Sequence, residues 1–366
     1  MMRRLALSAT LALALSACGG ASRQSAAPTL PPANPKAVSK MAQGVAAAKE
    51  KGGEARAIEL LRASVKMDPN LWEARYDLGV LLAERGELTD AEKELGAAFK
   101  LAPNAEDVAV ALAETRRRLG DPSEAVAVLE PFVKKQPKAV AARIALVSAL
   151  RESGKVDQAI EHAHEVLVRR PSDPSALAEL AMSHLERGET DTAELLITEA
   201  LKGDPNNAVA ERTAGLISLK KGDDAVAFRH FAHASELDPK DTTARLNTGT
   251  VLLQAGVYDK AAEEFRAVTA IKPDDVPAAL GLAASLRGLG SRDKPGPYHE
   301  AEKILKGILD REPKNASALF NLGILYSDFL QRPADAKPVL QKFLDVSSKS
   351  NPARAEAQRI VAGQKK

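Results

Sequence analysis

The sequence predicts an all-α solenoid, a stack of helical hairpins built from one repeated unit. Three residue types recur along the chain with a spacing of 34 residues. The first series is the glycines Gly52, Gly86, Gly120, Gly154, Gly188, Gly222, Gly256 and Gly290. The other two are the alanines Ala57, Ala91, Ala125, Ala159, Ala193, Ala227 and Ala261, and the prolines Pro69, Pro103, Pro137, Pro171, Pro205, Pro239 and Pro273. Because three series share one period, we expect one continuous array rather than separate domains.

Residues 72–105 show the pattern of a single unit. The apolar face of a first helix is formed by Leu78, Gly79 and Leu82, and that of a second helix by Ala91, Leu95 and Ala98. Gly86, between them, supplies the positive φ with which a helix can end, and Pro103 prevents the second helix from continuing. We expect the second helices to be N-capped by Thr89, Ser123, Asp157, Asp191 and Asp259.

A 34-residue helix-turn-helix period with Leu-Gly in the first helix, Ala in the second and a closing Pro resembles the tetratricopeptide repeat. The resemblance extends over residues 38–349. It implies a right-handed superhelix of about eight to nine repeats, in which the first helices line a concave side that binds a ligand.

The composition is that of an ordinary globular protein, with 45% hydrophobic and 27% charged residues. Only 4% of the residues are aromatic, so the core must be built from Ala, Leu and Val. The formal net charge is +2, which gives no overall field toward nucleic acid or an anionic membrane. We therefore expect no nucleic-acid partner.

The N-terminal residues have the layout of an export signal. Arg3 and Arg4 precede an apolar run over residues 5–15, which is too short to span a bilayer, so residues 1–17 are predicted to be a signal peptide. The adjacent arginines suggest a twin-arginine export signal as an alternative, but the residues that flank them do not match that motif, so Sec export is favoured. Residues 15–18, Leu-Ser-Ala-Cys, resemble the bacterial lipobox, which implies cleavage before Cys18 and a diacylglycerol and fatty acyl group on it.

Cys18 is the single cysteine of the chain, so no internal disulfide can form. The alternative to lipidation is a secreted protein in which Cys18 follows the signal peptide by chance. The residue after the cysteine is Gly19 rather than Asp. In the enterobacterial lipoproteins that this segment resembles, Asp at that position favours retention in the inner membrane. The resemblance therefore implies an outer-membrane lipoprotein facing the periplasm. Inner-membrane retention and a surface-exposed orientation stay open. Residues 18–37 are small, polar and proline-rich, and we expect the lipidated cysteine and a disordered tether there.

The two ends of the array depart from the pattern. The first repeat, residues 38–71, has a weak first helix at 41–50 and is expected to be an end unit. Residues 291–296 are an insertion that we expect to form an exposed loop, either tolerated or contacting a partner. A ninth unit over 316–349 has Leu330 at the turn and its alanine at Ala336. Residues 350–366 are expected to hold a capping helix at 353–361 and a tail.

No catalytic or phosphate-binding motif is present, and we expect that the protein is not an enzyme. His230 and His233 lie three residues apart on one helix, but no carboxylate or third histidine is evident beside them. We therefore expect no metal, no small-molecule substrate and no cofactor apart from the lipid on Cys18.

The resemblance implies which residues face a ligand on the first helices. In the first half these positions are mixed in character and fall on Tyr76, Val80, Ala83, Val110, Glu114, Arg117, Ile144, Ser148 and Arg151. Further along they form a nearly continuous apolar stripe, the predicted binding groove, of Met182, Leu185, Arg212, Leu216, Leu219, Leu246, Leu253, Leu280, Phe320 and Ile324. An exposed apolar strip suits a partner helix or extended peptide. The alternative is that these residues pack between repeats.

Together these features predict a membrane-anchored scaffold or adaptor of a bacterial envelope complex, such as one for secretion, pili, motility or outer-membrane assembly. Its partners would be envelope proteins or their peptide and helix segments. One alternative is a periplasmic chaperone for exported subunits. Another is an accessory subunit of a cell-wall enzyme, for which no acid-base carboxylate pair can be placed.

Overall fold

The computed structural model describes residues 31–363, so the predicted signal peptide, Cys18 and most of the predicted tether lie outside the described residues. The described residues form helices and no strand. The elements are α1 (Pro35–Ala48), α2 (Glu54–Met67), α3 (Trp72–Glu84), α4 (Leu88–Leu101), α5 (Glu106–Arg118), α6 (Pro122–Lys135), α7 (Val140–Glu152), α8 (Val156–Arg169), α9 (Pro174–Glu186), α10 (Thr190–Gly203), α11 (Ala208–Lys221), α12 (Asp224–Leu237), α13 (Thr242–Gln254), α14 (Tyr258–Ile271), α15 (Val276–Leu289), α16 (Gly296–Arg311), α17 (Ala316–Ile324), the π-helix η1 (Leu325–Phe329), α18 (Pro333–Val346) and α19 (Arg354–Val361). The predicted all-α solenoid of helix-turn-helix repeats is confirmed.

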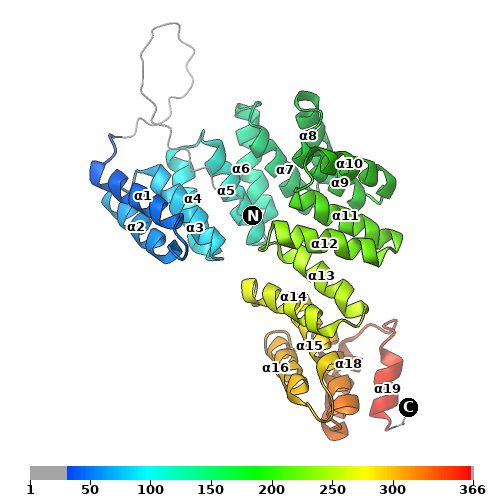
Figure 1. Cartoon of the computed structure of the whole chain (residues 1–366). Coiled ribbons are helices and arrows are strands. Elements are labelled where there is room, and N and C mark those ends of the chain that lie inside the picture. The colour runs from blue at the N-terminus through cyan, green and yellow to red at the C-terminus, as the bar shows by residue number, and fades with distance from the viewer. Residues whose placement is uncertain (1–30, 364–366) are drawn as a thin grey trace. The chain divides into compact units, whose positions relative to one another are not determined.

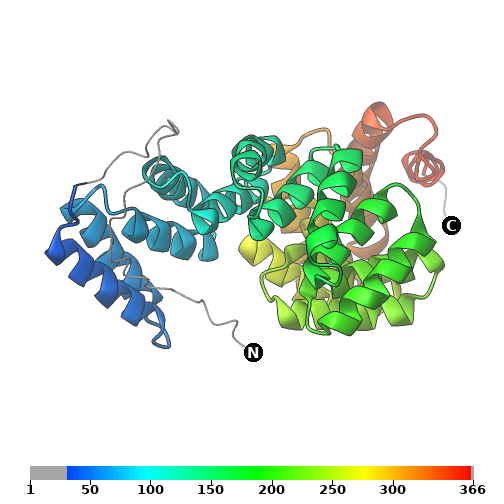
Figure 2. The same cartoon turned by 90° about the horizontal axis from the view of Figure 1, so that it is seen from above.

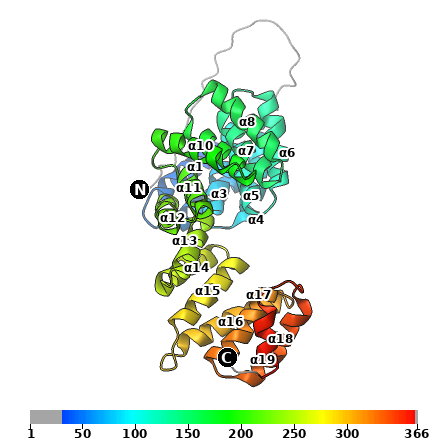
Figure 3. The same ribbon diagram turned by 90° about the vertical axis from the view of Figure 1, so that its right-hand side faces the viewer.

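The chain divides into two compact units, which we describe separately. Unit 1 is Met1–Gly203 and contains α1 to α10, and unit 2 is Asp204–Lys366 and contains α11 to α19. Within each unit an odd-numbered first helix packs against the even-numbered second helix of its own repeat and against the preceding second helix. Figures 1 and 2 show these pairs in unit 1, and Figure 3 shows the helices of unit 2 following one another from α11 to α19.

The repeated glycine in the first helix allows the two helices of a repeat to touch. A Cβ atom on Gly79 would lie 2.5 Å from Leu95 Cγ, and one on Gly215 would lie 2.5 Å from the ring of Phe231. Leu95 and Phe231 are both fully buried. The large side chain of the second helix therefore sits directly on the backbone of the first helix, which explains how a core with few aromatic residues packs densely.

Seven of the eight predicted turn glycines have the expected left-handed conformation, from Gly52 (φ 78°) to Gly256 (φ 76°). The prediction is wrong for Gly290, whose φ is −72°. The chain leaves α15 extended at this point and enters residues 291–296, which are all exposed, as the predicted loop requires. Gly290 is instead constrained by space, because a Cβ atom there would lie 2.1 Å from the ring of Tyr298.

The ninth repeat contains one extra residue, which the structure places in its first helix. The helix changes to π geometry over Leu325–Phe329, and this wider turn absorbs the insertion. As a result the left-handed turn residue is Gln331 (φ 54°) rather than the predicted Leu330. Phe329, at the end of η1, packs its ring against Tyr298, with 5.5 Å between centroids.

The predicted caps of the second helices are wrong where they can be checked. The helices α4, α6, α8 and α14 begin one residue before Thr89, Ser123, Asp157 and Asp259, respectively, and none of the four has a side-chain cap. Side-chain caps are instead found mainly on first helices. They are made by Asn34, Asp173, Asn207, Asp241, Asp275 and Asn315, four of which are spaced by 34 residues.

The ends of the array are ordered as helices. The first helix begins at Pro35 after the cap Asn34, three residues before the predicted start of the array and within the range assigned to the tether. At the other end α19 packs against α18 and buries Ala357 and Ile360. Within residues 31–363, no helix combines the length and the apolar character needed to cross a membrane.

Candidate functional site

The first helices of successive repeats form a continuous surface in each unit, which we call the first-helix wall. In unit 1, α3, α5, α7 and α9 each contact the first helix of the next or preceding repeat, and in unit 2 α13, α15 and α17 do the same. The closest contacts of the second helices are with first helices. The first helices therefore lie nearer to one another than the second helices do, as expected for the inner side of a curved stack.

The wall of unit 2 carries most of the predicted groove residues. Five of them pack against one core cluster while part of each side chain stays in solvent: Leu246, Leu253, Leu280, Phe320 and Ile324. Leu216 and Leu219, also half-buried, pack against a second cluster around Phe231. Each of these side chains thus contributes to repeat packing and still presents apolar surface.

Polar groups frame this apolar wall. Arg212 on α11 lies 3.4 Å from Asp241, whose other oxygen accepts hydrogen bonds from the first turn of α13. The Nε of Arg212 is buried without a hydrogen-bond partner. Thr250 is exposed on α13, between Leu246 and Leu253 on the same helical face.

The remaining two predicted groove residues belong to unit 1. Met182 on α9 is only 6% exposed, so its side chain is part of the core. Leu185, one turn later on the same helix, is half-buried. The apolar stripe is therefore a property of unit 2, and Met182 adds almost no surface to it.

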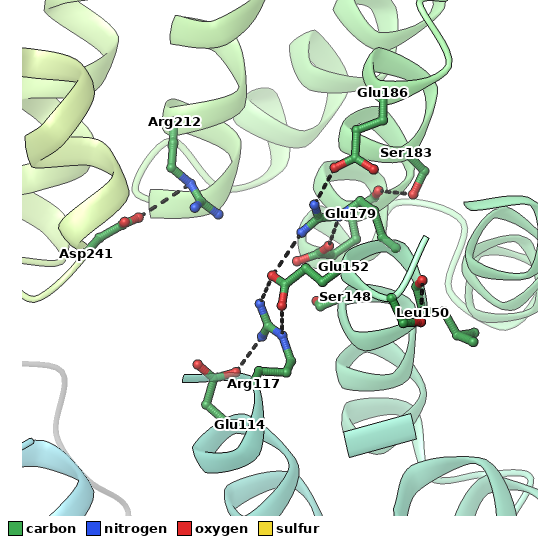
Figure 4. A network of polar contacts seen from close by, with 12 residues as sticks. Glu114, Arg117, Ser148, Leu150, Glu152, Glu179, Ser183, Glu186, Arg212 and Asp241 are labelled. Carbon is green, nitrogen blue, oxygen red and sulfur yellow. Dashed lines mark hydrogen bonds and ion pairs between the residues drawn. The ribbon is translucent and has the colours of Figure 1, made fainter. Parts of the chain in front are cut away.

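The wall of unit 1 is instead occupied by a network of ion pairs, shown in Figure 4. Arg117 on α5 donates from Nε to Glu152 on α7 over 2.8 Å and forms a second bond to the same carboxylate, while its other nitrogen reaches Glu114. Such a forked pair fixes both side chains more firmly than a single contact. The pair joins the first helices of two successive repeats.

Arg151 extends the network to the next repeat. Its Nη1 donates to Glu186 on α9 over 2.6 Å, and its Nη2 lies 3.4 Å from Glu152. The Nε faces Glu179 at 3.6 Å, beyond hydrogen-bond distance. Both this Nε and Oε2 of Glu179 are buried without a hydrogen-bond partner, and the two side chains are 9% and 10% exposed.

Carboxylates are crowded along this wall. Desolvation by the surrounding helices raises the pKa of Glu114 above its ordinary value, and Arg117 offsets this only in part. On α3, burial and the neighbouring Glu73 raise the pKa of Asp77 to about 6. Burial, Asp107 and Asp77 raise the pKa of Tyr76 to about 12. Negative charge is thus disfavoured at three places on the first helices of unit 1.

The structure corrects the prediction for the histidine pair in unit 2. Glu211 on α11, which the sequence analysis missed, pairs with Nδ1 of His230 at 2.6 Å and with Nδ1 of His233 at 3.0 Å. Burial raises the pKa of Glu211, but the two histidine contacts outweigh it and hold that pKa below its ordinary value. No group of three or more potential ligands in residues 31–363 is arranged to hold a metal ion.

A spacing of 19 residues could have revealed this contact. It joins equivalent positions of the first and second helix in Arg75–Glu94, Arg143–His162 and Arg245–Glu264 as well as in Glu211–His230. His230 is therefore part of a recurring contact between the two helices of a repeat, and here the acidic residue lies on the first helix instead of the second.

Comparison with known families decides the identity of the repeat. One model of the tetratricopeptide repeat matches residues 50–115 and 218–286, and a second model of the same repeat matches residues 110–154 and 144–208. The chain belongs to the tetratricopeptide repeat family. Proteins built from tetratricopeptide repeats generally mediate protein–protein interactions.

Solved structures agree with the fold. A chain in the crystal structure of the APC/C hetero-tetramer Cut9-Hcn1 matches with a TM-score of 0.63 and 16% identity over 84% of this chain and 59% of that chain. This tetratricopeptide repeat protein thus spans less than two thirds of that relative. The structure titled as a functional characterization of Pseudomonas aeruginosa pilF matches with a TM-score of 0.51 and 22% identity, over 61% of this chain and 98% of that one. No curated protein matches.

Proposed function

We propose that this tetratricopeptide repeat protein is a lipid-anchored scaffold of a bacterial envelope complex, which holds a segment of a partner protein on its first-helix wall. The anchor is proposed from the sequence, in which an export signal ends in Leu-Ser-Ala before Cys18. The expected location is the periplasmic face of the outer membrane. Binding of partner proteins is a general property of the family. For this chain we propose that the partners belong to an envelope complex.

The observation that carries the proposal is the apolar wall of unit 2. Leu216, Leu219, Leu246, Leu253 and Leu280 are half-buried at equivalent positions of successive first helices. A side chain that is held by the core on one side and reaches solvent on the other is a preorganised contact, because little conformational entropy is lost when a partner covers it. An amphipathic helix or an extended segment can lay its apolar residues along such a row.

Under this proposal the protein acts by holding a partner at a defined place near the membrane. A lipid on Cys18 keeps the chain at the membrane, and the residues before Pro35 give it reach. A partner segment bound to the wall is then held near the membrane at high effective concentration. Dual acylation with a diacylglycerol and a fatty acyl chain makes such anchoring stable, since a single chain binds membranes only reversibly.

The test is proximity labelling in cells, with mass spectrometry of the labelled neighbours. Wild-type protein should label one defined set of envelope components, and Cys18→Ala should lose that set because the protein leaves the membrane. Leu216→Glu combined with Leu253→Glu should lose it while the protein stays in the membrane fraction, because two charges interrupt the apolar row.

Since both leucines also contact the core, a further variant separates binding from folding. Thr250→Glu puts a charge at an exposed position of the same row, and Ala270→Glu puts one at an exposed position of the second helix α14. Thr250→Glu should weaken labelling at unchanged thermal stability, and Ala270→Glu should not. Unchanged labelling in all wall variants would contradict the wall assignment. Diffuse labelling of many exported proteins would favour the chaperone alternative.

A further inference from the structure

The first helices of unit 1 carry an excess of negative charge although the whole chain is nearly neutral. Helices α3, α5, α7 and α9 together hold nine carboxylates and six guanidinium groups. Helix α1, at the end of the unit, adds two lysines, so the excess of three carboxylates lies on α3, α5, α7 and α9 and falls to one when α1 is included. The corresponding elements of unit 2, α11, α13, α15, α17 and η1, hold two carboxylates and five basic groups. The excess of carboxylates is therefore confined to one wall.

Within that wall the charges of the network do not balance. Arg117 is shared between Glu114 and Glu152, and Arg151 is shared among Glu152, Glu179 and Glu186. Arg117 and Arg118 both lower the pKa of Glu114, but they do not bring it back to its ordinary value. A further cation at this place would be stabilised by all four carboxylates.

The unpaired atoms show where such a cation would act. Arg151 is held by Glu186, so its Nε stays 3.6 Å from Glu179 and both atoms lack a hydrogen bond. A buried carboxylate oxygen without a partner is unfavourable, because its lost hydration is not replaced. If a ligand cation takes Glu186, Arg151 is free to move onto Glu179 and satisfy both atoms.

The outer members of the network are accessible to a ligand. The side chains of Glu186 and Glu114 are 37% and 49% exposed, whereas Glu179 and Arg151 are buried beneath them. Glu114 lies on α5 and Glu186 on α9, two repeats further along the wall. Two cationic side chains of one segment could therefore pair with them while the segment crosses α7.

We propose that the wall of α5, α7 and α9 in unit 1 binds a basic segment of a partner protein, with Glu114 and Glu186 pairing with its lysine or arginine side chains. This inference rests on the proposed function, in which first-helix walls hold partner segments, and it assigns the chemistry of the occupant in unit 1. Charge complementarity would give this contact fast association and a marked dependence on salt.

The experiment uses the full chain in a non-ionic detergent and a fluorescein-labelled dodecapeptide of alternating Lys and Ala, followed by fluorescence anisotropy at low salt. A peptide of the same length with Glu in place of Lys is the probe of opposite charge. We expect binding of the Lys peptide only. Glu114→Gln combined with Glu186→Gln should weaken it at least about 10-fold, because two charge pairs of a similar kind are lost.

The matched control is Glu130→Gln combined with Glu161→Gln, which removes the same charge from exposed positions of the second helices α6 and α8. It should change the dissociation constant less than about 2-fold, as expected for distant surface charges under screening. Equal effects of the two double variants, or equal binding of the Glu peptide, would overturn the proposal. Self-association through this wall, seen as a salt-sensitive dimer in light scattering that the first double variant abolishes, would overturn it too.

The outcome is distinguishable from that of the proposed function. Thr250→Glu lies in unit 2 and should leave binding of the Lys peptide unchanged even if it abolishes labelling in cells. Conversely, the Lys peptide can fail to bind while the apolar wall still recruits its partner. Circular dichroism melts of the two Gln double variants check that neither has unfolded, since the substitution is nearly isosteric.

Discussion

The first-helix walls of the two units are built from the same repeat and differ in how they are held together. In unit 1, Arg117 and Arg151 tie successive first helices through charge-assisted hydrogen bonds. In unit 2, side chains such as Leu253 and Leu280 pack against a shared apolar core. The difference shows that the repeat prescribes helix pairing through a few buried positions and leaves the residues of the wall free to vary.

The same difference appears in the carboxyl groups of the two units. On the first helices of unit 1, burial and Glu73 raise the pKa of Asp77, and burial raises the pKa of Glu114 more than Arg117 lowers it. In unit 2 the pKa of Glu302 is lowered, because Lys306 and Tyr326 outweigh its burial. The charged form of Glu302 is therefore stabilised by its partners, whereas the charged forms of Asp77 and Glu114 are disfavoured by burial.

The largest expected effect comes from removing a buried charge of unit 1. Arg151→Met leaves Glu179 and Glu186 without their cation, and we expect a loss of about 3 kcal/mol in the free energy of unfolding at pH 7. Urea denaturation followed by circular dichroism measures it.

A double-mutant cycle tests whether the loss arises from the pair. Arg151→Met combined with Glu179→Met replaces a buried ion pair by two apolar side chains, which is often neutral or stabilising. The double variant should therefore be more stable than Arg151→Met. If the two losses simply add, the network does not hold α7 and α9 together, and the contrast between the walls disappears.

Helix pairing was predictable from the sequence because the same residue type recurs at the same position of successive repeats. Gly79, Ala91 and Leu95 occupy fixed places in the period, and the structure packs them against one another as the period requires. The π-helix was not predictable in the same way. One extra residue near Leu330 can lengthen a turn or widen a helix, and only the packing of Phe329 against Tyr298 distinguishes the two.

The candidate site was predictable only in part, for a related reason. Family positions placed Glu114, Arg117 and Arg151 on the wall, but their partners Glu152 and Glu179 come from neighbouring repeats, and no single-repeat pattern contains them. Contacts between repeats depend on how one unit is stacked on the next. The apolar residues were easier to place, yet Met182 turned inward, since one helical position separates the wall from the core.

A smaller effect is expected from an apolar residue of the unit 2 wall. Leu253→Ala should lower the free energy of unfolding by about 1.5 kcal/mol, less than the 2–5 kcal/mol typical of a fully buried leucine, because Leu253 is half-buried. Its neighbour Leu252, 8% exposed, is the matched control, and Leu252→Ala should lose about twice as much. Urea denaturation at low and at high salt provides the measurement.

Salt is the discriminating variable in that measurement. The loss in Leu253→Ala should be the same at both salt concentrations, since burial of apolar area carries no charge term, whereas the loss in Arg151→Met should decrease at high salt. A salt-dependent loss in Leu253→Ala would mean that Arg212 or another charge of unit 2 acts through this leucine. In that case the two walls would not differ in kind.

The smallest effect concerns a single crowded carboxyl on α3. Burial, followed by Glu73, raises the pKa of Asp77 to about 6, so the folded chain holds a proton that the unfolded chain releases between about pH 4 and pH 6. Ionised Asp77 therefore destabilises the fold above about pH 6 and not below about pH 4. Asp77→Asn should raise the free energy of unfolding by about 1 kcal/mol at pH 8, less than the full shift implies because the half-buried group is screened by solvent.

Urea denaturation of both proteins at pH 4, 6 and 8 gives the profile. The gain should vanish at pH 4, where wild-type Asp77 is itself protonated, and Asp191→Asn at an exposed position of α10 should change stability by less than about 0.5 kcal/mol at every pH. A gain that persists at pH 4 would point to a lost hydrogen bond or packing change instead of charge. The crowding of charge on the unit 1 wall would then be limited to the network around Arg117 and Arg151.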